Sequence, residues 1–207
     1  NDNELKQFSA YMNAYENIIE DTLFGASVFT FKKTSSAPVQ VILSDSIKTM
    51  VSGGASLLTF FGHGSQQGFD QAIDEPELYS NAGRYPFVVA NSCYSGEIHD
   101  PGQTSVSKRF VFAKSKGSIG FLAGTSLGYT HSLDHYSGKF YRALSVSHYN
   151  KGIGEIIKQA AIENATSGEF ITKLASLDMT LHGDPALKIG NGLLPDYQIR
   201  NNDVSFN

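Results

Sequence analysis

The pattern of apolar and polar residues alternates between two periods along the chain. Apolar residues recur every three or four positions, as in amphipathic helices, in five segments: residues 4–22, 44–54, 105–114, 131–144 and 154–164. Three short runs instead have the composition and length of buried strands: residues 57–61, 86–91 and 118–122. Because helical and strand segments alternate, we expect an α/β fold with a mostly parallel central sheet flanked by helices.

Two further segments are expected at the margins of this sheet. Residues 26–31 alternate between apolar and polar side chains, which predicts a strand after the first helix. Residues 179–189 are expected to return as an edge strand or a turn. Inside that segment, Gly183-Asp184-Pro185 predicts a turn or a helix start, and therefore a structural role.

Two of the buried runs end in a reactive side chain. His63 follows the run at 57–61, and Cys93 follows the run at 86–91. Ligands of open α/β sheets bind beyond the carboxyl ends of the strands, and the 30 positions between the two residues (93 − 63) allow a crossover between neighbouring strands. We therefore expect both side chains at one edge of the sheet. There the thiolate of Cys93 would act as nucleophile, and the imidazole of His63 would activate it and protonate the leaving amine.

The glycine that follows the histidine has a separate expected role. Gly64 allows close approach of the backbone to a substrate, so its N–H and that of Cys93 are candidates for an oxyanion hole. Removing one such donor typically costs about 3 kcal/mol of transition-state stabilisation. The residues alone leave two alternatives open, a buried inert thiol at Cys93 and an ordinary loop histidine at His63.

Three segments, in this order, resemble the motifs of the gingipain-like cysteine peptidases: Phe61-Gly62-His63-Gly64-Ser65, Asn91-Ser92-Cys93-Tyr94-Ser95-Gly96 and Leu181-His182-Gly183-Asp184-Pro185-Ala186-Leu187. The resemblance covers roughly residues 40 to 190, the extent of one domain. It implies a caspase-like three-layer sandwich, with Cys93 as nucleophile, His63 as general base and the Gly64 and Cys93 amides as oxyanion hole. It also implies a protein that is secreted by a bacterium or held at its surface, in a family that includes the signal peptidases of type IX secretion.

The resemblance leaves part of the site unassigned. In the family an upstream acidic residue orients the catalytic histidine, and five residues are candidates here: Glu4, Glu16, Glu20, Asp21 and Asp45. No carboxylate can be assigned to the substrate pocket. Gly124, Thr125 and Ser126 follow the third buried run, so we expect them to form a wall of that pocket.

A second histidine pair offers a competing site. His131 and His135 stand four residues apart on one predicted helix with Asp134 between them, as in helix-borne zinc sites, but the glutamate usual after the first histidine is missing. We expect a helix turn beside the cleft and assign no metal ligands. We also expect no cofactor; calcium is an option in secreted relatives, but no ligand loop is recognisable.

Composition limits the classes of partner. The 207 residues are 41% hydrophobic and 17% charged, enough for one domain with its own core. A formal net charge of −4 gives no reason to expect a nucleic-acid partner, and no apolar stretch has the length of a membrane span. The single cysteine excludes an intrachain disulfide and a multi-cysteine zinc site. We therefore expect a protein or peptide substrate.

These expectations combine into one predicted organisation. Residues 1–190 are expected to form the caspase-like peptidase domain, a piece of a longer chain that lacks an early strand of the sheet. Residues 191–207 are expected to be a linker or the start of a β-sandwich module, so further domains of the same chain are expected partners. The predicted function is a cysteine endopeptidase that works through a Cys-His dyad and an acyl-enzyme. The alternatives are an inactive caspase-like binding module of a surface protein, and a transpeptidase or signal peptidase of type IX secretion.

Overall fold

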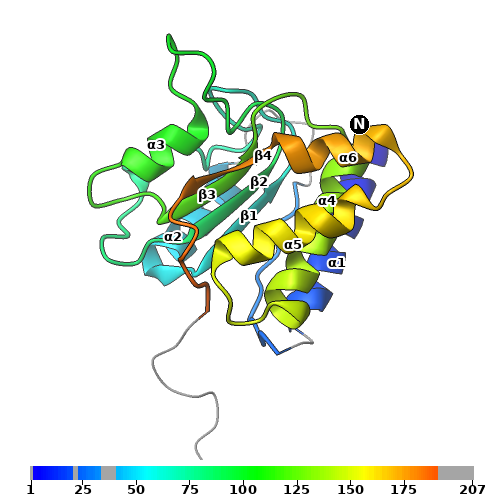
Figure 1. Ribbon diagram of the computed structural model, residues 1–207. Coiled ribbons are helices and arrows are strands. Elements are labelled where there is room, and N and C mark those ends of the chain that lie inside the picture. Colours follow the sequence, from blue (N-terminus) through cyan, green and yellow to red (C-terminus); the bar gives the residue numbers. More distant parts are fainter. Residues whose placement is uncertain (1, 21–22, 34–40, 191–207) are drawn as a thin grey trace, which may run out of the picture.

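The computed structural model describes residues 2–20, 23–33 and 41–190 (Figure 1). Its sheet has four strands, β1 (Leu57–Phe61), β2 (Phe87–Asn91), β3 (Gly120–Gly124) and β4 (Met179–Gly183), in that spatial order. β1, β2 and β3 are parallel, and β4 runs antiparallel to β3 at the edge. The mostly parallel α/β fold expected from the sequence is confirmed. The third strand begins two residues later than the run at 118–122 predicted.

Helices cover both faces of the sheet and make three layers (Figure 1). On one face lie α1 (Asp2–Glu20), α4 (Thr130–Arg142), α5 (Ile153–Ala165) and α6 (Phe170–Asp178). On the other lie α2 (Val41–Gly54) and α3 (Val106–Phe112). A short 3₁₀ turn, η1 (Pro76–Leu78), precedes β2, and a π-helical turn, η2 (Ala143–Ser147), continues α4.

The central strand explains why the site lies on a rigid base. Every residue of β2 is buried, because helices pack on both of its faces and strands on both of its edges. Phe87 and Val89 point into the core under α4 and α5, whereas Val88 and Ala90 point into the core under α2 and α3. Parallel strands covered in this way are continuous apolar runs, which is the pattern seen in the sequence.

Three sequence predictions differ from the structure. Residues 26–31 are extended, and residues 26–30 alternate between half-buried and exposed positions, but the segment joins no ladder, so the predicted strand is wrong. Helix α6 was not predicted at all. Helix α2 begins at Val41, before the expected start at Ser44 and Asp45. The expected linker or module at 191–207 lies outside the described residues.

The outer edge of β1 borders a groove of about 800 Å³. Residues 26–33 line the groove opposite β1. Side chains of α1 line it on one face of the sheet, and side chains of α2 line it on the other. In the described part of the chain, β2 is the one strand that pairs with β1.

Candidate active site

The predicted nucleophile and base lie on adjacent loops. β1 and β2 pair in register from Leu57 with Phe87 to Phe61 with Asn91, and the Gly62 N–H donates to the Asn91 carbonyl at 3.2 Å just past the strand ends. Beyond that bond the loops touch, because a Cβ added to Gly64 would stand 2.8 Å from the Cβ of Ser92. His63 and Cys93 therefore follow neighbouring strands at the same edge, as the sequence predicted.

Cys93 is half-buried and its sulfur is bound by a glycine from another loop. The Gly128 N–H donates to the Cys93 Sγ at 3.4 Å, and the Sγ lies 3.8 Å from the Gly128 carbonyl oxygen. The Gly128 backbone therefore fixes the position of the sulfur at the end of β2. Gly128 has no room for a side chain here, since its Cβ would lie 3.3 Å from the Ser92 backbone.

His63 contacts the first turns of α1. Its Nε2 lies 3.6 Å from the Glu4 Oε2, and its ring meets Phe8 edge-on at 5.8 Å between centroids. The two side chains of the pair are 65% and 44% exposed, so their attraction is screened and contributes little to stability. The contact places a carboxylate beside one ring nitrogen, which is the position from which an acid can orient an imidazole.

Glu4 is thus the candidate orienting acid that the structure brings to His63. Glu16 and Glu20, two of the other candidates, accept hydrogen bonds from Thr30 and from the Val28 N–H and so hold the extended segment. Asp21 lies outside the described residues.

The backbone amides of Gly64 and Cys93, the candidate oxyanion hole, lie on the two loops that touch. The turn that contains Gly64 is closed by the Ser65 N–H on the Gly68 carbonyl, at 2.8 Å, and by the Asp70 N–H on the His63 carbonyl, at 2.9 Å. Within the described residues, no group accepts a hydrogen bond from either the Gly64 or the Cys93 N–H. Two free donors on touching loops are what an oxyanion hole requires.

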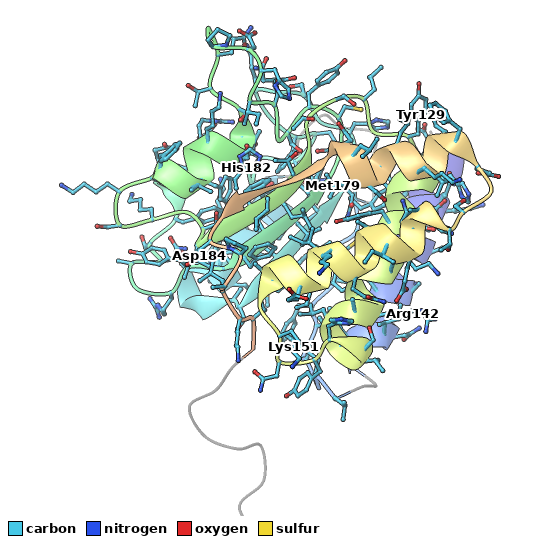
Figure 2. The ribbon with its side chains drawn as sticks, in the orientation of Figure 1. Tyr129, Arg142, Lys151, Met179, His182 and Asp184 are labelled. Carbon is cyan, nitrogen blue, oxygen red and sulfur yellow. The ribbon has the colours of Figure 1, made fainter. Side chains whose placement is uncertain are left out.

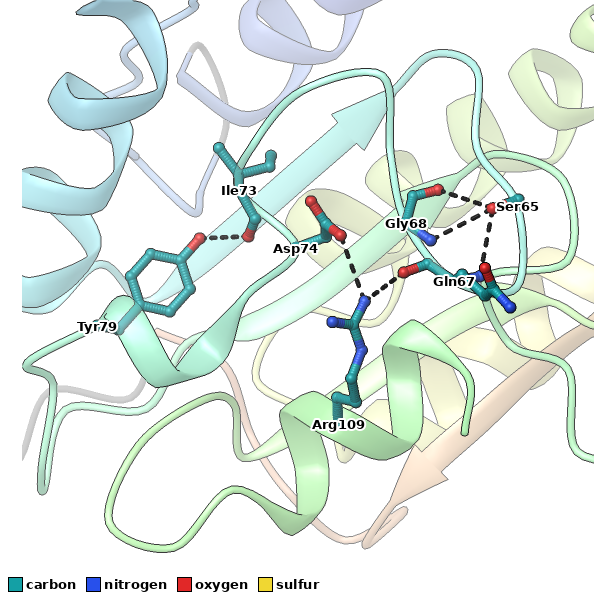
Figure 3. Close-up of polar contacts among 7 residues, drawn as sticks. All are labelled: Ser65, Gln67, Gly68, Ile73, Asp74, Tyr79 and Arg109. Atoms are coloured by element: carbon teal, nitrogen blue, oxygen red, sulfur yellow. Dashed lines mark hydrogen bonds and ion pairs between the residues drawn. The ribbon is translucent and has the colours of Figure 1, made fainter. Parts of the chain in front are cut away.

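Figure 3 shows how the loop after His63 is held. The Ser65 Oγ accepts bonds from the N–H groups of Gln67 and Gly68 at 3.2 and 3.3 Å. Arg109 of α3 donates to the Gln67 carbonyl and lies 3.3 Å from the Asp74 Oδ2, with both side chains of this ion pair mostly buried. The loop is therefore attached to a helix of the opposite layer as well as to its own strand.

A cavity of about 240 Å³ opens beside the cysteine. Its lining is largely apolar and comes from the Cys93 loop, the loop before α4, and α4 and α6: Tyr94, Ser126, Leu127, Gly128, Tyr129, Ser132, Leu133, Ile171, Leu174, Ala175 and Asp178. Of the predicted pocket residues, Ser126 lines this cavity, whereas Gly124 and Thr125 do not. The Thr125 Oγ1 instead donates to the Asp178 Oδ1 at 3.1 Å, behind the wall.

The α6 side of this cavity is the part of the site that the sequence analysis missed. The signal was present, because Ile171, Leu174, Ala175 and Asp178 recur at the three- and four-residue spacing of one helix face. Asp178 supplies the single carboxylate of the lining.

The competing histidine pair is engaged elsewhere. The His131 Nε2 lies 3.7 Å from Glu169, and the His135 Nδ1 bonds the Asn164 Oδ1 at 2.7 Å. Asp134 accepts a 2.8 Å bond from the Tyr15 hydroxyl. The part of the chain that the structure describes holds no cluster of three His, Cys, Asp or Glu side chains arranged for a metal. Among its helices, none combines the length and apolar character of a bilayer span.

Known structures share this fold. The crystal structure of the Arg-specific cysteine proteinase gingipain R (RgpB) superimposes with a TM-score of 0.74 at 16% identity, over 87% of this chain and 42% of that one. A complex of Porphyromonas gingivalis RgpB pro- and mature domains gives a TM-score of 0.73 at 16% identity, over 86% and 43%. The chain thus spans less than half the length of these proteins, and at such identities the likeness shows the fold alone.

The sequence comparisons are more specific. Comparison with curated protein sequences gives no match. The sequence profile of peptidase family C25, in contrast, matches residues 1–190, nearly the whole chain. The caspase-like α/β fold, the motifs at the ends of β1 and β2 and this match agree, and the chain belongs to peptidase family C25.

Proposed function

We propose that this chain is the catalytic domain of a cysteine endopeptidase, with Cys93 as nucleophile and His63 as general base. The observation that carries the proposal is the contact of the two loops, in which the Gly64 backbone packs on Ser92. The nearby cavity is lined by Tyr94, the residue after Cys93, and by Gly128, whose N–H donates to the Cys93 sulfur. Membership of a peptidase family supports the proposal.

The reaction follows from the groups at this edge of the sheet. His63 takes the thiol proton, and the Cys93 sulfur attacks the scissile carbonyl while the Gly64 and Cys93 N–H groups bind the oxyanion. His63 then gives the proton to the leaving amine, which departs as the carbon–nitrogen bond breaks and leaves an acyl-enzyme. Water, deprotonated by His63, attacks the thioester and releases the acid and the free thiol. Glu4 orients the imidazole throughout.

The cavity beside Cys93 receives a substrate side chain. Its apolar walls favour the aliphatic part of that side chain, and its volume of about 240 Å³ limits the size. Protein and peptide substrates therefore suit the site, and no step needs a cofactor.

Two features of the proposal concern context. From the resemblance to the gingipain family we infer secretion or attachment to a bacterial surface, with type IX secretion as the route. If an amine rather than water attacks the acyl-enzyme, the same residues perform transpeptidation. An inactive binding module is the outcome if Cys93 is not activated.

The test is the rate at which iodoacetamide alkylates Cys93 as a function of pH, followed by mass. We expect a fast rate that persists below the unperturbed thiol pKa of about 8.5 and falls in His63→Ala. His131→Ala is the matched control, because the two histidines have similar surroundings. His63 is 65% exposed and lies 3.6 Å from a glutamate, and His131 is 64% exposed and lies 3.7 Å from a glutamate.

The control should leave the alkylation rate unchanged. A slow rate in the wild type that His63→Ala does not alter would refute the peptidase proposal and leave the binding module. If the dyad is active, product analysis with and without an added amine separates hydrolysis from transpeptidation.

A further inference from the structure

The cavity of about 240 Å³ lies next to the proposed nucleophile. Two of its lining residues connect it to Cys93: Tyr94 follows the cysteine in the chain, and the Gly128 N–H donates to the Cys93 sulfur at 3.4 Å. A substrate whose carbonyl carbon meets this sulfur therefore has a neighbouring side chain within reach of the cavity. The chemistry of the cavity walls then decides which side chain is accepted.

The walls consist mainly of apolar side chains from three elements. Leu133 of α4 is almost fully buried, whereas Ile171 and Leu174 of α6 are half-buried. Leu127 and Tyr129, on the loop before α4, are each 55% exposed, and Tyr129 lies beside α6 (Figure 2). Apolar side chains left exposed around a hollow are typical of a binding site, because their burial waits for a ligand.

The one carboxylate of the lining is already engaged. The Asp178 Oδ1 accepts a 3.1 Å bond from the Thr125 Oγ1, and the Asp178 backbone carbonyl accepts from the Thr125 N–H at 3.2 Å. The Oδ2 packs on Gly124, since a Cβ added there would lie 2.6 Å from it. Both carboxylate oxygens therefore lie against the end of β3, and Asp178 ties α6 to that strand instead of receiving a cation.

Other polar groups of the lining offer a charged side chain no partner. Among the described residues, no lysine, arginine or histidine lines the cavity. The Ser132 hydroxyl oxygen is fully buried, so it lies beneath the surface that a substrate would touch. An acidic or a basic side chain would lose its water here without a counter-charge, which costs more than its apolar part gains.

The volume sets the size of the occupant. An apolar protein cavity of about 150 Å³ holds a benzene ring. The larger cavity here, about 240 Å³, has room for such a ring together with the methylene group that joins it to a peptide backbone. Leucine and methionine side chains also fit this space.

We propose that the site selects a neutral apolar side chain, between leucine and phenylalanine in size, at one substrate position beside the scissile bond. The inference rests on the proposed function of Cys93 and His63, and it names the substrate class of that site. It assigns the choice to the apolar wall that α6 and the loop before α4 form, and not to the Asp178 carboxylate.

The experiment is a peptide library in which each position beside the scissile bond is varied in turn and kcat/KM is measured. At one position, leucine, methionine and phenylalanine should exceed alanine by at least about tenfold. At the same position they should exceed arginine, lysine and glutamate by at least about a hundredfold. Asp178→Asn should leave the ratio of leucine to arginine cleavage within about threefold of the wild type, because the carboxylate does not select the substrate.

A carboxylate placed in the wall should change the preference. Leu174→Glu should raise the ratio of arginine to leucine cleavage at least about tenfold, because the new charge can pair with a substrate cation. Leu177→Glu is the matched control: it adds the same charge to the same helix, at a residue that is 82% exposed and outside the lining, and should leave the ratio unchanged.

Three results would overturn the proposal: a wild type that prefers arginine or lysine, loss of arginine cleavage in Asp178→Asn, or equal ratios in the Leu174→Glu and Leu177→Glu variants. If alkylation of Cys93 does not depend on His63, the proposed function fails, and binding then decides the question of the cavity. Calorimetric titration of Cys93→Ala with the leucine and arginine peptides supports the proposal if the leucine peptide binds more tightly. Equal or weaker binding of the leucine peptide overturns it.

Discussion

The contact between the two catalytic loops can be tested by adding a single methyl group. In Gly64→Ala the new Cβ would lie 2.8 Å from both the Cβ and the Oγ of Ser92, and 3.2 Å from the Phe69 ring. Carbon atoms pack at about 3.5–4.0 Å, so the loops must separate by about 0.7–1.2 Å. Gly64 does not have a positive φ, so the contact, and not backbone strain, is the perturbation.

The size of the effect follows from that displacement. A shift of about 1 Å in a reacting group costs about a hundredfold in rate. Loss of one oxyanion donor costs about a hundredfold to a thousandfold. We therefore expect kcat/KM of Gly64→Ala to fall about a hundredfold, together with a loss of about 1–3 kcal/mol in the free energy of unfolding from overpacking.

The assay is kcat/KM on the best substrate from a quenched-fluorescence peptide library, with urea unfolding in parallel. Gly138→Ala on α4 is the matched control, because no atom lies within 4 Å of its added Cβ. It should keep full activity and gain about 0.5–1 kcal/mol in the free energy of unfolding. Ser92→Gly in the Gly64→Ala background removes the opposing atoms and should restore about tenfold of the lost activity, relative to Ser92→Gly alone.

A folded Gly64→Ala variant whose kcat/KM stays within threefold of the wild type would refute the reasoning. Such a ratio corresponds to a change of about 0.7 kcal/mol or less in the activation free energy. It would mean that the Gly64 amide does not lie where the oxyanion forms. The double variant guards against a different error, because failure to recover activity would show that the added methyl acts elsewhere than on Ser92.

Three further predictions concern single side chains. Glu4→Gln should lower the Cys93 alkylation rate and kcat by about fivefold or less, because an exposed charge pair contributes no more than that. Glu169→Gln is the control: it changes the glutamate beside His131 and should alter neither quantity. Arg109→Met should lower the free energy of unfolding by about 1–3 kcal/mol in urea titrations, because the Gln67 carbonyl and the Asp74 carboxylate both lose a charged donor; an unchanged midpoint would contradict this. Burial raises the pKa of the Asp134 carboxyl, although the hydrogen bond from Tyr15 acts in the opposite direction. The protonated carboxyl therefore stabilises the folded state fully below the usual carboxyl pKa, and this stabilisation is lost as the pH rises through the raised pKa. Asp134→Asn should therefore unfold at higher urea than the wild type near pH 7 but not near about pH 3, and equal gains at both would exclude the ionisation of Asp134 as the cause.

The parts of the fold that the sequence predicted correctly are those with a strong local signal. The run at 86–91 forms a strand that is buried on both faces, and the run at 57–61 forms a half-buried strand beside it; apolar runs of this kind have few other stable environments. His63 and Cys93 could be placed at one edge because parallel neighbours must end on the same side of a sheet. At residues 26–31 the same kind of signal gave a wrong prediction. The apolar and polar side chains do alternate there, but a strand also needs a partner strand, and the local pattern carries no information about one.

The parts that the sequence could not predict depend on contacts between distant segments. Glu4 was one acidic candidate among five until the packing of α1 on the β1 edge brought it to His63, 59 positions away (63 − 4). The cavity combines the Cys93 loop with α6, whose residues lie more than 75 positions later in the chain (171 − 94 = 77). No periodicity or spacing encodes such pairs, because they are set by how the layers pack.

The half-buried thiol of Cys93, held against the Gly128 backbone, has a consequence for how the protein responds to oxidants. Cys93 is the single cysteine of these 207 residues, so a sulfenic acid formed on it has no resolving thiol in the same sequence with which to form a protective disulfide. Peroxide should therefore carry it on to the sulfinic acid, which ordinary reductants do not reverse. Oxidation of this one sulfur would therefore remove the proposed nucleophile. Purification in a buffer that contains a small thiol should raise the fraction of the protein that iodoacetamide can alkylate at Cys93.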